Sequence, residues 1–419
     1  MKSMGGRIAM VNKEAAQVRF NPMNRRNGNE MNIPEFVSPK AAQIAQAFHR
    51  TFPDYHPTPL VGLPKLAAKL GIRQLLVKDE SHRFGLNAFK VLGASYAMAC
   101  YLCDRLKLPI EEADFAYLRS EEVKRQLGEL TFVTATDGNH GRAVAWAAAQ
   151  LGQRAVVYLP KGSASQRVEA IRQTGAHAHV INGSYDEAVR LSDQMARERG
   201  WQVIQDTAWE GYTDIPAWIM QGYTTMAAEA IQQIAEQFPE EAPTHLFLQA
   251  GVGSMAAAVL GHVVARNPSK YPFTIIVEPH AADCFYRSAT GDGRALPAMG
   301  DLRTIMAGLA CGEPSPLAWE ILRDYADAFA SCPDSVAADG MRSLGLPVGD
   351  DQPIVSGESG AVGVGLLAAL MQQEEWEDFR KTAKLDETSV VLCFSTEGDT
   401  DRESYERIVR HDAKIKGKA

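Results

Sequence analysis

Short apolar runs alternate with longer stretches of helical periodicity along the middle of the chain, from residue 130 to about residue 206. Consecutive apolar residues favour buried strands, whereas apolar residues that recur every three or four positions favour amphipathic helices. Strands separated by helices of about 10–15 residues predict right-handed βαβ crossovers and a parallel sheet. The expected strands are residues 130–136, 154–159, 177–181 and 201–206, and the expected helices are residues 140–151, 165–174 and 185–199.

A second series of the same kind follows. Near the N-terminal end, a strand at 75–77 precedes a helix that begins near Val91. The two series predict an α/β protein with two open, twisted parallel-sheet domains and a cleft between them. Ligands in such folds bind beyond the carboxyl ends of the strands, so the turns at these ends are candidate functional positions. The second series comprises expected strands at 244–249, 273–277 and 389–394 and expected helices at 215–236, 255–266 and 360–374.

The composition fits a protein with a large core that acts on small molecules. Of 419 residues, 46% are apolar and 22% are charged, which predicts two or three domains. The chain has 43 Lys and Arg against 51 Asp and Glu, a formal net charge of −8. No basic stripe is therefore expected to neutralise phosphates, and no nucleic-acid partner is expected.

The sequence also predicts a cytoplasmic protein. The first residues lack the apolar stretch of a signal peptide. Residues 242–265 carry no formal charge, but glycine and polar residues at 249–254 interrupt them, so no membrane span is expected. The six cysteines show no metal-ligand spacing and are expected to be mostly reduced core residues, while an approach of Cys284 to Cys311 stays open.

The turn at 249–254 and the helix after it form a candidate anion site. Gly251 and Gly253 allow a ligand to approach the backbone, and a helix N-terminus favours negative charge. The run 251–256 also fits the dinucleotide fingerprint G-x-G-x-x-A, and Glu278 ends the next strand, although farther along than the ~20 residues expected for a ribose-binding acid. A phosphate site, an NAD-dependent dehydrogenase and a glycine-rich turn without a ligand are the three alternatives.

A candidate reactive lysine lies in a different turn, at 81–90. Lys90 falls in the first turn of an apolar helix, where the positive end of the helix and apolar neighbours disfavour the ammonium form. We therefore expect a lowered pKa for Lys90 and an amine that acts as nucleophile or base. The alternative is a lysine on the surface of an amphipathic helix.

Four segments together resemble the motifs of the fold-type II pyridoxal-phosphate enzymes, the group of tryptophan synthase β, the serine and threonine dehydratases and cysteine synthase. Their order and spacing cover nearly the whole chain. The resemblance implies that residues 1–92 and 209–419 form a large cofactor-binding domain and residues 93–208 a small α/β domain, with the active site between them. The four segments are Asn-Ala-Phe-Lys at 87–90, Asp-Gly-Asn-His-Gly at 137–141, the glycine-rich turn at 251–255 and Ser-Thr-Glu-Gly-Asp at 395–399.

The resemblance implies pyridoxal phosphate as the cofactor and assigns roles to the matching residues. Lys90 would hold the cofactor covalently and then take the α-proton of the substrate. Asn139 would bond the 3′-oxygen of the ring, and Ser395 or Thr396 would meet the pyridine nitrogen, with Ser395 preferred because it directly follows a strand. The phosphate would lie on Gly251, Val252, Gly253, Ser254 and Met255, and the substrate on Thr136, Asp137, Gly138 and His140.

Two acids distinguish this chain from the dehydratases of the group. Asp137 stands where those enzymes have a small or hydroxyl residue, and Asp206 ends a neighbouring strand. A carboxylate about 4 Å from a cationic amine contributes up to about 4 kcal/mol at an effective dielectric constant near 20. The two acids therefore suit an amino-acid substrate with a second, cationic amino group. Asp137 is also a candidate base for removing the α-proton of the D enantiomer of such a substrate.

The resemblance implies α,β-elimination of an amino-acid substrate, 2,3-diaminopropionate in its D and L forms, to pyruvate and two ammonia molecules. The alternatives are a pyridoxal-phosphate-dependent serine/threonine dehydratase within the group and an NAD-dependent dehydrogenase outside it. The resemblance also implies a homodimer. No metal site is expected.

Overall fold

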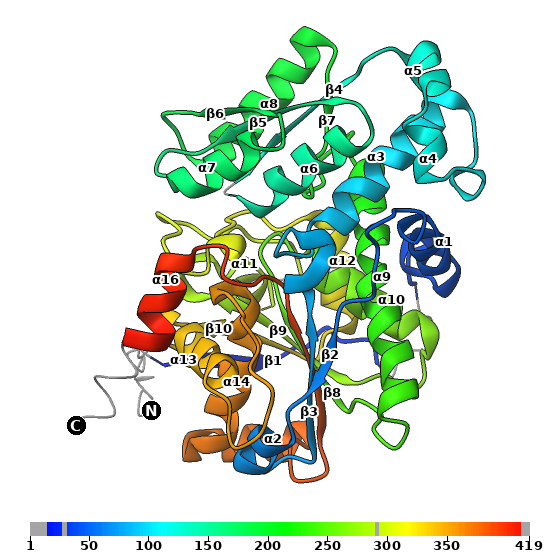
Figure 1. The fold of residues 1–419 in the computed structure, drawn as a ribbon. Helices are drawn as coiled ribbons and strands as arrows, with labels where there is room; N and C mark the ends of the chain where they lie inside the picture. The colour runs from blue at the N-terminus through cyan, green and yellow to red at the C-terminus, as the bar shows by residue number, and fades with distance from the viewer. Residues whose placement is uncertain (1–14, 27–31, 137, 290–292, 412–419) are drawn as a thin grey trace, which may run out of the picture.

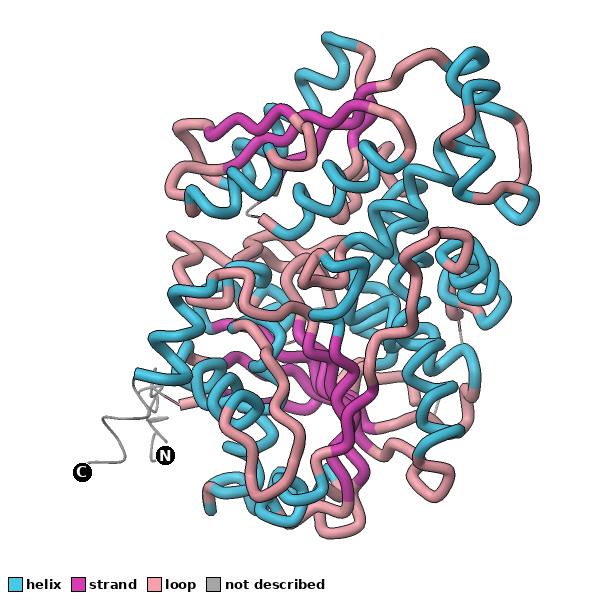
Figure 2. The backbone as a smooth tube through the Cα atoms, in the orientation of Figure 1, coloured by secondary structure: helices cyan, strands magenta, loops and turns pink. Residues whose placement is uncertain are grey.

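Two β-sheets organise the residues that the structure describes, which are 15–26, 32–136, 138–289 and 293–411 of a computed structural model (Figure 1, Figure 2). Within these residues the larger sheet has seven strands in the order β1-β10-β9-β8-β11-β3-β2, and the smaller has four in the order β6-β5-β4-β7. All pairs are parallel except β1 with β10 and β2 with β3, at the two edges of the larger sheet. The expected α/β fold with two sheets is confirmed, and antiparallel edge strands make the larger sheet mixed.

The strands follow the hydrophobic pattern closely where the chain alternates strand and helix. The expected strand at 201–206 is the main exception, because only two of its residues pair with β4. The larger sheet consists of β1 Gln17–Phe20, β2 Leu60–Gly62, β3 Gln74–Asp79, β8 His245–Gln249, β9 Phe273–Pro279, β10 Ala328–Cys332 and β11 Val390–Ser395. The smaller sheet consists of β4 Thr131–Ala135, β5 Arg154–Leu159, β6 His177–Val180 and β7 Gln202–Val203.

Helices cover both faces of the larger sheet, so its central strands are buried on both sides. Successive residues of β8 show this: Leu246 and Leu248 belong to one apolar cluster, and Phe247 to the other. Such strands are expected to be continuously apolar rather than alternating. The apolar cluster on one face includes residues of α1 Pro39–His49, α9 Asp214–Gln237, α10 Ser254–Arg266 and α12 Pro316–Tyr325, and the cluster on the other includes residues of α2 Pro64–Leu70, α13 Asp334–Gly345, α14 Glu358–Gln372 and α15 Glu377–Ala383.

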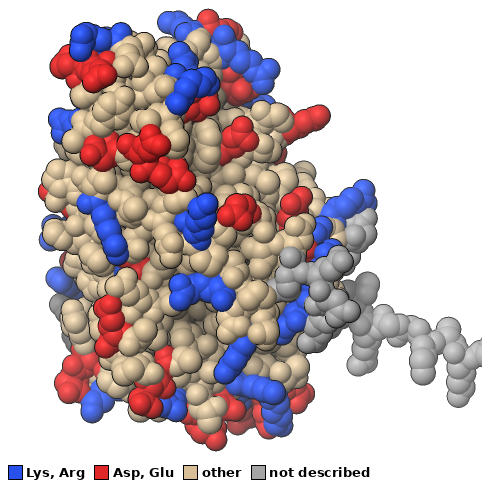
Figure 3. Space-filling model, turned by 90° about the vertical axis from the view of Figure 1, so that its right-hand side faces the viewer, with Lys and Arg blue, Asp and Glu red and all other residues tan. Residues whose placement is uncertain are grey.

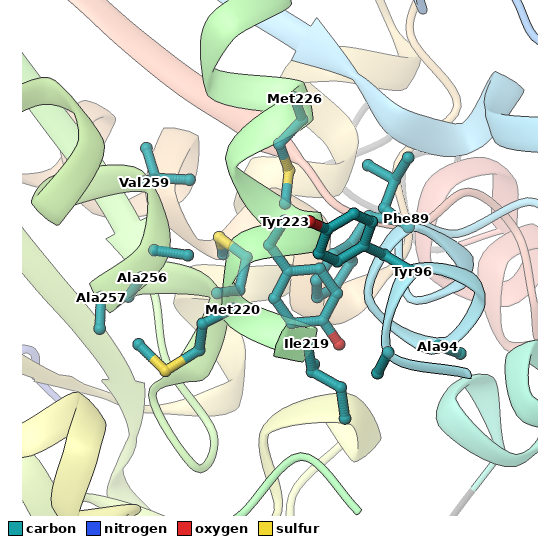
Figure 4. Packing of buried hydrophobic residues seen from close by; sticks show 14 of the residues in the cluster. Phe89, Ala94, Tyr96, Ile219, Met220, Tyr223, Met226, Ala256, Ala257 and Val259 are labelled. Carbon is teal, nitrogen blue, oxygen red and sulfur yellow. The ribbon is translucent and has the colours of Figure 1, made fainter. Parts of the chain in front are cut away.

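The contact between α3 Val91–Leu106 and α9 joins the two parts of the fold. Figure 4 shows Tyr223 of α9 near Phe89, which lies just before α3, and the centroids of their rings are 4.8 Å apart. Glycines let these helices approach closely, because a Cβ on Gly222 would lie 2.4 Å from the carbonyl oxygen of Leu92, and one on Gly93 would lie 2.6 Å from Tyr223. This contact fixes the start of α3, where Lys90 lies.

Helices α6 Asn139–Gln150, α7 Ser165–Arg172 and α8 Tyr185–Arg199 pack against the smaller sheet. All four strands of this sheet lie within 93–208 and all strands of the larger sheet lie outside that range, while the domain boundaries themselves stay a prediction. The remaining α-helices are α4 Phe115–Leu118, α5 Glu121–Leu127, α11 Cys284–Ser288 and α16 Arg402–Glu406, and a 3₁₀ helix spans Glu80–Gly85.

The surface carries charges of both signs. On the face seen in Figure 3, basic and acidic side chains are interspersed, and no stripe of one sign crosses it. In the described part of the chain, none of the helices combines the length and the apolar character that a membrane crossing requires.

Candidate active site

A cavity of about 490 Å³ lies between the carboxyl ends of strands from the two sheets. It brings together turns that are far apart in the sequence. Asp137 lies outside the described residues, and Gly138 and Ser395 do not line the cavity. The predicted site residues that do line it are Lys90, Thr136, Asn139, His140, Asp206, Gly251, Val252, Gly253, Ser254, Met255 and Thr396.

Backbone pairing with the final turn of the site holds the turn that carries Lys90. Ala88 forms an antiparallel bridge with Glu397, and the N–H of Phe89 donates to the carbonyl of Thr396 at 3.2 Å. The N–H of Gly398 donates to the carbonyl of Asn87 at 3.1 Å, and a Cβ on Gly398 would lie only 2.1 Å from Asn87 Oδ1. These hydrogen bonds hold residues 87–89 against residues 396–398, about 300 positions later in the sequence, where both segments line the cavity.

Lys90 forms an ion pair with Asp206. Its Nζ lies 2.5 Å from Asp206 Oδ2, and the side chains are 18% and 4% exposed. Burial acts to lower the pKa of Lys90, but the attraction of the Asp206 carboxylate outweighs it and the pKa is raised. The expected lowering is therefore wrong for this structure, because the sequence did not show that an acid would meet the amine.

Asp206 is held by both sides of the cleft. Burial acts to raise its pKa, but Lys90 and then His140 outweigh burial and lower the pKa to about 2, so the group is ionised at neutral pH. Ser254, at the start of α10, donates its hydroxyl to the backbone carbonyl of Asp206 at 2.6 Å. The acid is thereby fixed beside the glycine-rich turn.

His140 presents an unused acceptor to this pair. Its Nε2 lies 2.9 Å from the carbonyl oxygen of Ile204, which can only accept, so Nε2 carries the proton and Nδ1 is an acceptor. Nδ1 is buried, has no hydrogen-bond partner and lies 4.0 Å from Asp206 Oδ2. Burial lowers the pKa of His140 and keeps the ring neutral. A ligand N–H group would satisfy this atom.

The glycine-rich turn has the geometry of an anion cradle. Gly253 precedes α10 with φ +91°, and a Cβ there would lie 2.4 Å from the ring of Phe285. Helix α10 begins at Ser254, so the N–H groups of its first turn have no partners within the helix, and Gly253, Ser254 and Met255 line the cavity. The turn therefore fits the phosphate of pyridoxal phosphate.

Thr396, rather than the preferred Ser395, reaches the cavity. Ser395 is fully buried, and its hydroxyl donates to Ser356 at 2.8 Å. Gln249 Nε2 donates to the carbonyl of Phe394 and to Thr396 Oγ1, both at 2.8 Å. Because Thr396 Oγ1 accepts from an amide, its own hydrogen remains available to donate to a ligand atom such as an unprotonated pyridine nitrogen.

Sequence reasoning missed Glu397 and Gln249 as cavity residues. Glu397 is 5% exposed and accepts a hydrogen bond from Asn139 Nδ2, on the opposite side of the cleft. It also accepts from the backbone N–H of Ser359 at 3.2 Å. The only available sequence signal was its place in the polar turn at 395–399, which does not reveal a contact with Asn139.

The dinucleotide alternative is wrong, because the carboxylate that it requires is already engaged. Glu278 is fully buried and accepts the backbone N–H groups of Phe285 at 2.9 Å and Tyr286 at 2.7 Å. Burial raises its pKa to about 8. Glu278 therefore caps the start of α11 and does not face a ribose. None of the six cysteines forms a disulfide, while Cys284 and Cys311 do approach each other, because both sulfur atoms lie beside Gly251.

Comparisons with known proteins agree with this geometry. The family model described as pyridoxal-phosphate dependent enzyme matches residues 51–394. Diaminopropionate ammonia-lyase of Escherichia coli strain K12 is 54% identical over 373 residues, covering 89% of this chain and 92% of that protein. The enzyme of the same name from Salmonella typhimurium is 48% identical over 398 residues, covering 94% and 98%. A crystal structure of the Escherichia coli enzyme in complex with D-serine matches with a TM-score of 0.87 and 49% identity, covering 95% of this chain and 97% of that chain.

Proposed function

The chain belongs to the family of pyridoxal-phosphate dependent enzymes, and from this premise we propose that it converts 2,3-diaminopropionate and water to pyruvate and two ammonia molecules. The observation that carries the proposal is the ion pair of Lys90 with the buried carboxylate of Asp206 inside the cavity. The two relatives named diaminopropionate ammonia-lyase, which this chain covers over most of their length, support the same substrate. Serine/threonine dehydratase activity is the alternative that these relatives disfavour.

The cofactor would be held by residues that already lie in position around the cavity. Lys90 would bind its carbonyl carbon, the turn 251–255 its phosphate, Asn139 its 3′-oxygen and Thr396 its ring nitrogen. Bound pyridoxal phosphate supplies a sink for the electron pair left at Cα when the α-proton is removed. A neutral hydroxyl donor at the ring nitrogen leaves that nitrogen unprotonated, which suits elimination.

The second amino group of the substrate would replace the ammonium of Lys90. A Lys90 that held the cofactor would no longer be an ammonium, and Asp206 would be left as a buried carboxylate without its cationic partner. An unpaired buried charge is costly, so the site attracts another cation. The β-ammonium of 2,3-diaminopropionate supplies this charge, and Nδ1 of His140 is ready to accept one of its N–H groups. Serine and threonine offer no such cation.

The protons would be handled by the same side chains. Lys90 would remove the proton from Cα of the substrate. Asp206 keeps the β-nitrogen protonated, so that it leaves as neutral ammonia. Asp137, which lies outside the described residues, is proposed as the base for the D enantiomer from its place in the sequence next to the cavity loop.

The proposal is tested by trapping the cofactor and by assaying a small substrate panel. Reduction with borohydride and peptide mapping should place a pyridoxyl group on Lys90. Pyruvate and ammonia should be released in a 1:2 ratio from D- and L-2,3-diaminopropionate. Release of pyruvate from serine with equal efficiency, or 2-oxobutyrate from threonine, would favour the dehydratase, and an unlabelled, colourless protein would overturn both.

The role of Asp137 is tested with the two enantiomers. A positioned acid–base group contributes about 10²–10⁴-fold to the rate. We expect Asp137→Asn to lower kcat on the D form by this factor and kcat on the L form much less. Equal losses on both forms would show that Asp137 binds substrate without acting as the D-specific base.

We also propose a cytoplasmic homodimer. The absence of disulfides among the cysteines supports a reducing compartment. The dimer rests on the family resemblance alone, and sedimentation equilibrium of the purified chain tests it directly.

A further inference from the structure

Glu397 is a buried carboxylate at the cavity for which the proposed reaction has no use. It lies between β11 and α16 in the larger part of the fold, and burial and then the nearby charge of Glu397 raise the pKa of Glu358. One oxygen accepts the N–H of Ser359 in the first turn of α14. The other accepts Asn139 Nδ2 and, at 3.4 Å, the hydroxyl of Thr400. No ion pair to Glu397 is found among the described residues, so its contacts are hydrogen bonds from neutral donors.

These contacts fix the orientation of the Asn139 amide. A carboxylate can only accept hydrogen bonds, so the nitrogen of the amide, and not its oxygen, must face Glu397. Asn139 is the first residue of α6 and belongs to the smaller part of the fold, whereas Glu397 belongs to the larger. The hydrogen bond therefore also ties the two parts together across the cleft. One hydrogen on Asn139 Nδ2 remains for a ligand.

Glycines make room for this arrangement. A Cβ on Gly357 would lie 3.1 Å from the Cγ atom of Glu397 and 2.5 Å from the carbonyl oxygen of Gly398. The bridge between Ala88 and Glu397 fixes the backbone of the acid opposite the turn that carries Lys90. Contacts on two sides therefore set the position of the carboxylate, so that it can hold the side chain of Asn139 in one orientation.

We propose that Glu397 is a positioning residue for the cofactor: its carboxylate holds the amide of Asn139 so that the remaining Nδ2–H points to the 3′-oxygen of bound pyridoxal phosphate. The inference rests on the role proposed for Asn139. Glu397 acts through Asn139 and does not itself touch the reacting atoms. Its loss should therefore have the same effect on the bound cofactor as the loss of Asn139.

The pH at which the absorbance of the bound cofactor changes should move in opposite directions in two cases: when Glu397 acts through Asn139, and when its negative charge acts directly on the 3′-oxygen. The absorbance of the lysine-bound cofactor changes when its 3′-oxygen ionises, and a donated hydrogen bond favours the ionised form. Loss of the oriented donor should raise the pH of this transition, by roughly 1 pH unit for a hydrogen bond to a charged group. Removal of a negative charge that acted directly on the oxygen would lower it instead.

The experiment compares absorbance and pyridoxal-phosphate affinity in the full chain, stripped of cofactor and reloaded, for wild type, Glu397→Ala, Glu397→Gln and Asn139→Ala. We expect Glu397→Ala to shift the transition upward, as Asn139→Ala does, and to weaken affinity roughly 10-fold. Glu397→Gln keeps an oxygen that can accept from Asn139 and should restore most of the wild-type behaviour. It also keeps the experiment decisive if the alanine variant does not fold.

A double variant and a matched control complete the test. In an Asn139→Ala background, Glu397→Ala should add less than about a two-fold change, because coupled residues are not additive. Glu358→Gln removes the same charge at the same 5% exposure, but Glu358 bonds Ser404 and does not line the cavity, so the transition should stay at the wild-type pH. No shift, a downward shift or an additive shift in the double variant overturns the inference. Failure of wild type to bind pyridoxal phosphate would instead overturn the proposed function.

Discussion

The turn at 81–90 contributes Arg83 to one cluster of buried charges and Lys90 to another, and the two clusters differ in how completely their hydrogen bonds are satisfied. The first, here called the Glu229 network, consists of Lys78, Glu80, Arg83 and Glu229, all at most 1% exposed. The second, the cavity cluster, consists of Lys90, Asp206 and His140.

Every donor of the Glu229 network has an acceptor. The ammonium of Lys78 donates to Glu229 at 2.7 Å, to the carbonyl of Thr58 at 2.7 Å and to Gln233 at 2.8 Å. The guanidinium of Arg83 donates to Glu80 and Glu229 through several N–H groups at 2.7–2.9 Å. Such a network stabilises one arrangement of the backbone and offers nothing to a ligand.

The cavity cluster is incomplete by comparison. Nδ1 of His140 has no partner, and Lys90 is 18% exposed with one close acceptor, Asp206. The comparison indicates that the saturated network serves the fold and positions the Lys90 turn, whereas the unsaturated cluster is prepared for a ligand. Loss of a charge should therefore reduce stability in the first cluster and activity in the second.

The largest effect is expected for Lys90→Ala. Without the amine, neither covalent attachment of the cofactor nor removal of the α-proton is possible, so release of pyruvate should fall by at least about 10⁴-fold, or ~5.4 kcal/mol. The melting temperature should fall, but by less than in Glu229→Gln, because water that enters the cavity can partly solvate the unpaired carboxylate of Asp206. Lys161→Ala is the control, since Lys161 also lines the cavity, whereas the ion pairs of Asp206 in the described residues are with Lys90 and His140. Wild-type turnover in Lys90→Ala would assign the reactive amine elsewhere.

The second prediction concerns the saturated network. Glu229→Gln leaves Lys78 and Arg83 without their shared counter-charge, and breaking a buried ion pair costs about 3–5 kcal/mol. Urea unfolding should show this loss, while the turnover of the folded enzyme falls far less than in Lys90→Ala. The control is Glu236→Gln, on the exposed face of the same helix, with a change within about 0.5 kcal/mol. If Glu229→Gln left stability intact, the division between the two clusters would not hold.

Most of the fold could be predicted from sequence because strict alternation of strand and helix leaves a clear pattern. The helix expected at 215–236 is Asp214–Gln237, and the strand expected at 389–394 is Val390–Ser395. The edge strands β1 and β2 were missed, because three or four residues show no periodicity. β10 was missed for a different reason, since its sequence Ala-Phe-Ala-Ser-Cys mixes small and polar residues.

The site could be predicted only as far as each turn carries its own signal. Lys90, Asn139 and the glycine-rich turn form recognisable motifs, and all of them line one cavity. The pairing of Lys90 with Asp206 and of Asn139 with Glu397 depends on how two sheets face each other, and these partners are 116 and 258 residues apart in sequence. The raised pKa of Lys90 follows from such a pairing, which is why helix position alone gave the wrong sign.

The third prediction separates a cationic substrate from a neutral one at Asp206. Asp206→Asn should weaken the binding of 2,3-diaminopropionate by about 10²-fold, or ~2.7 kcal/mol, as expected for loss of a charge-assisted contact in a buried site. Binding of serine, followed by the absorbance of the bound cofactor, should change by less than about three-fold. Asp214→Asn, an exposed acid at the start of α9, serves as the control. Equal losses for both ligands would mean that Asp206 does not recognise the second amine.

The smallest effect is a difference in acid sensitivity between the two clusters. Burial acts to raise the pKa of Glu229, but Arg83 and Lys78 outweigh it, so the pKa lies below the ordinary value of 4.5. A carboxyl whose pKa is lowered on folding stabilises the protein above its unfolded pKa, and this contribution is lost as the pH falls. Between pH 7 and pH 4 the pKa of Glu229 in the unfolded chain determines how much of this stabilisation is lost, and the loss is about 1 kcal/mol. For Asp206, whose ordinary pKa is 3.8, the same change of pH lowers the free energy of unfolding by only about 0.3 kcal/mol.

Urea unfolding at pH 7 and pH 4 measures this difference. The free energies of unfolding of wild type and Glu229→Gln should differ by about 1 kcal/mol less at pH 4 than at pH 7, whereas the difference between wild type and Asp206→Asn should stay nearly constant. An unchanged gap for Glu229→Gln would mean that its carboxylate is not held in the ionised form by the network.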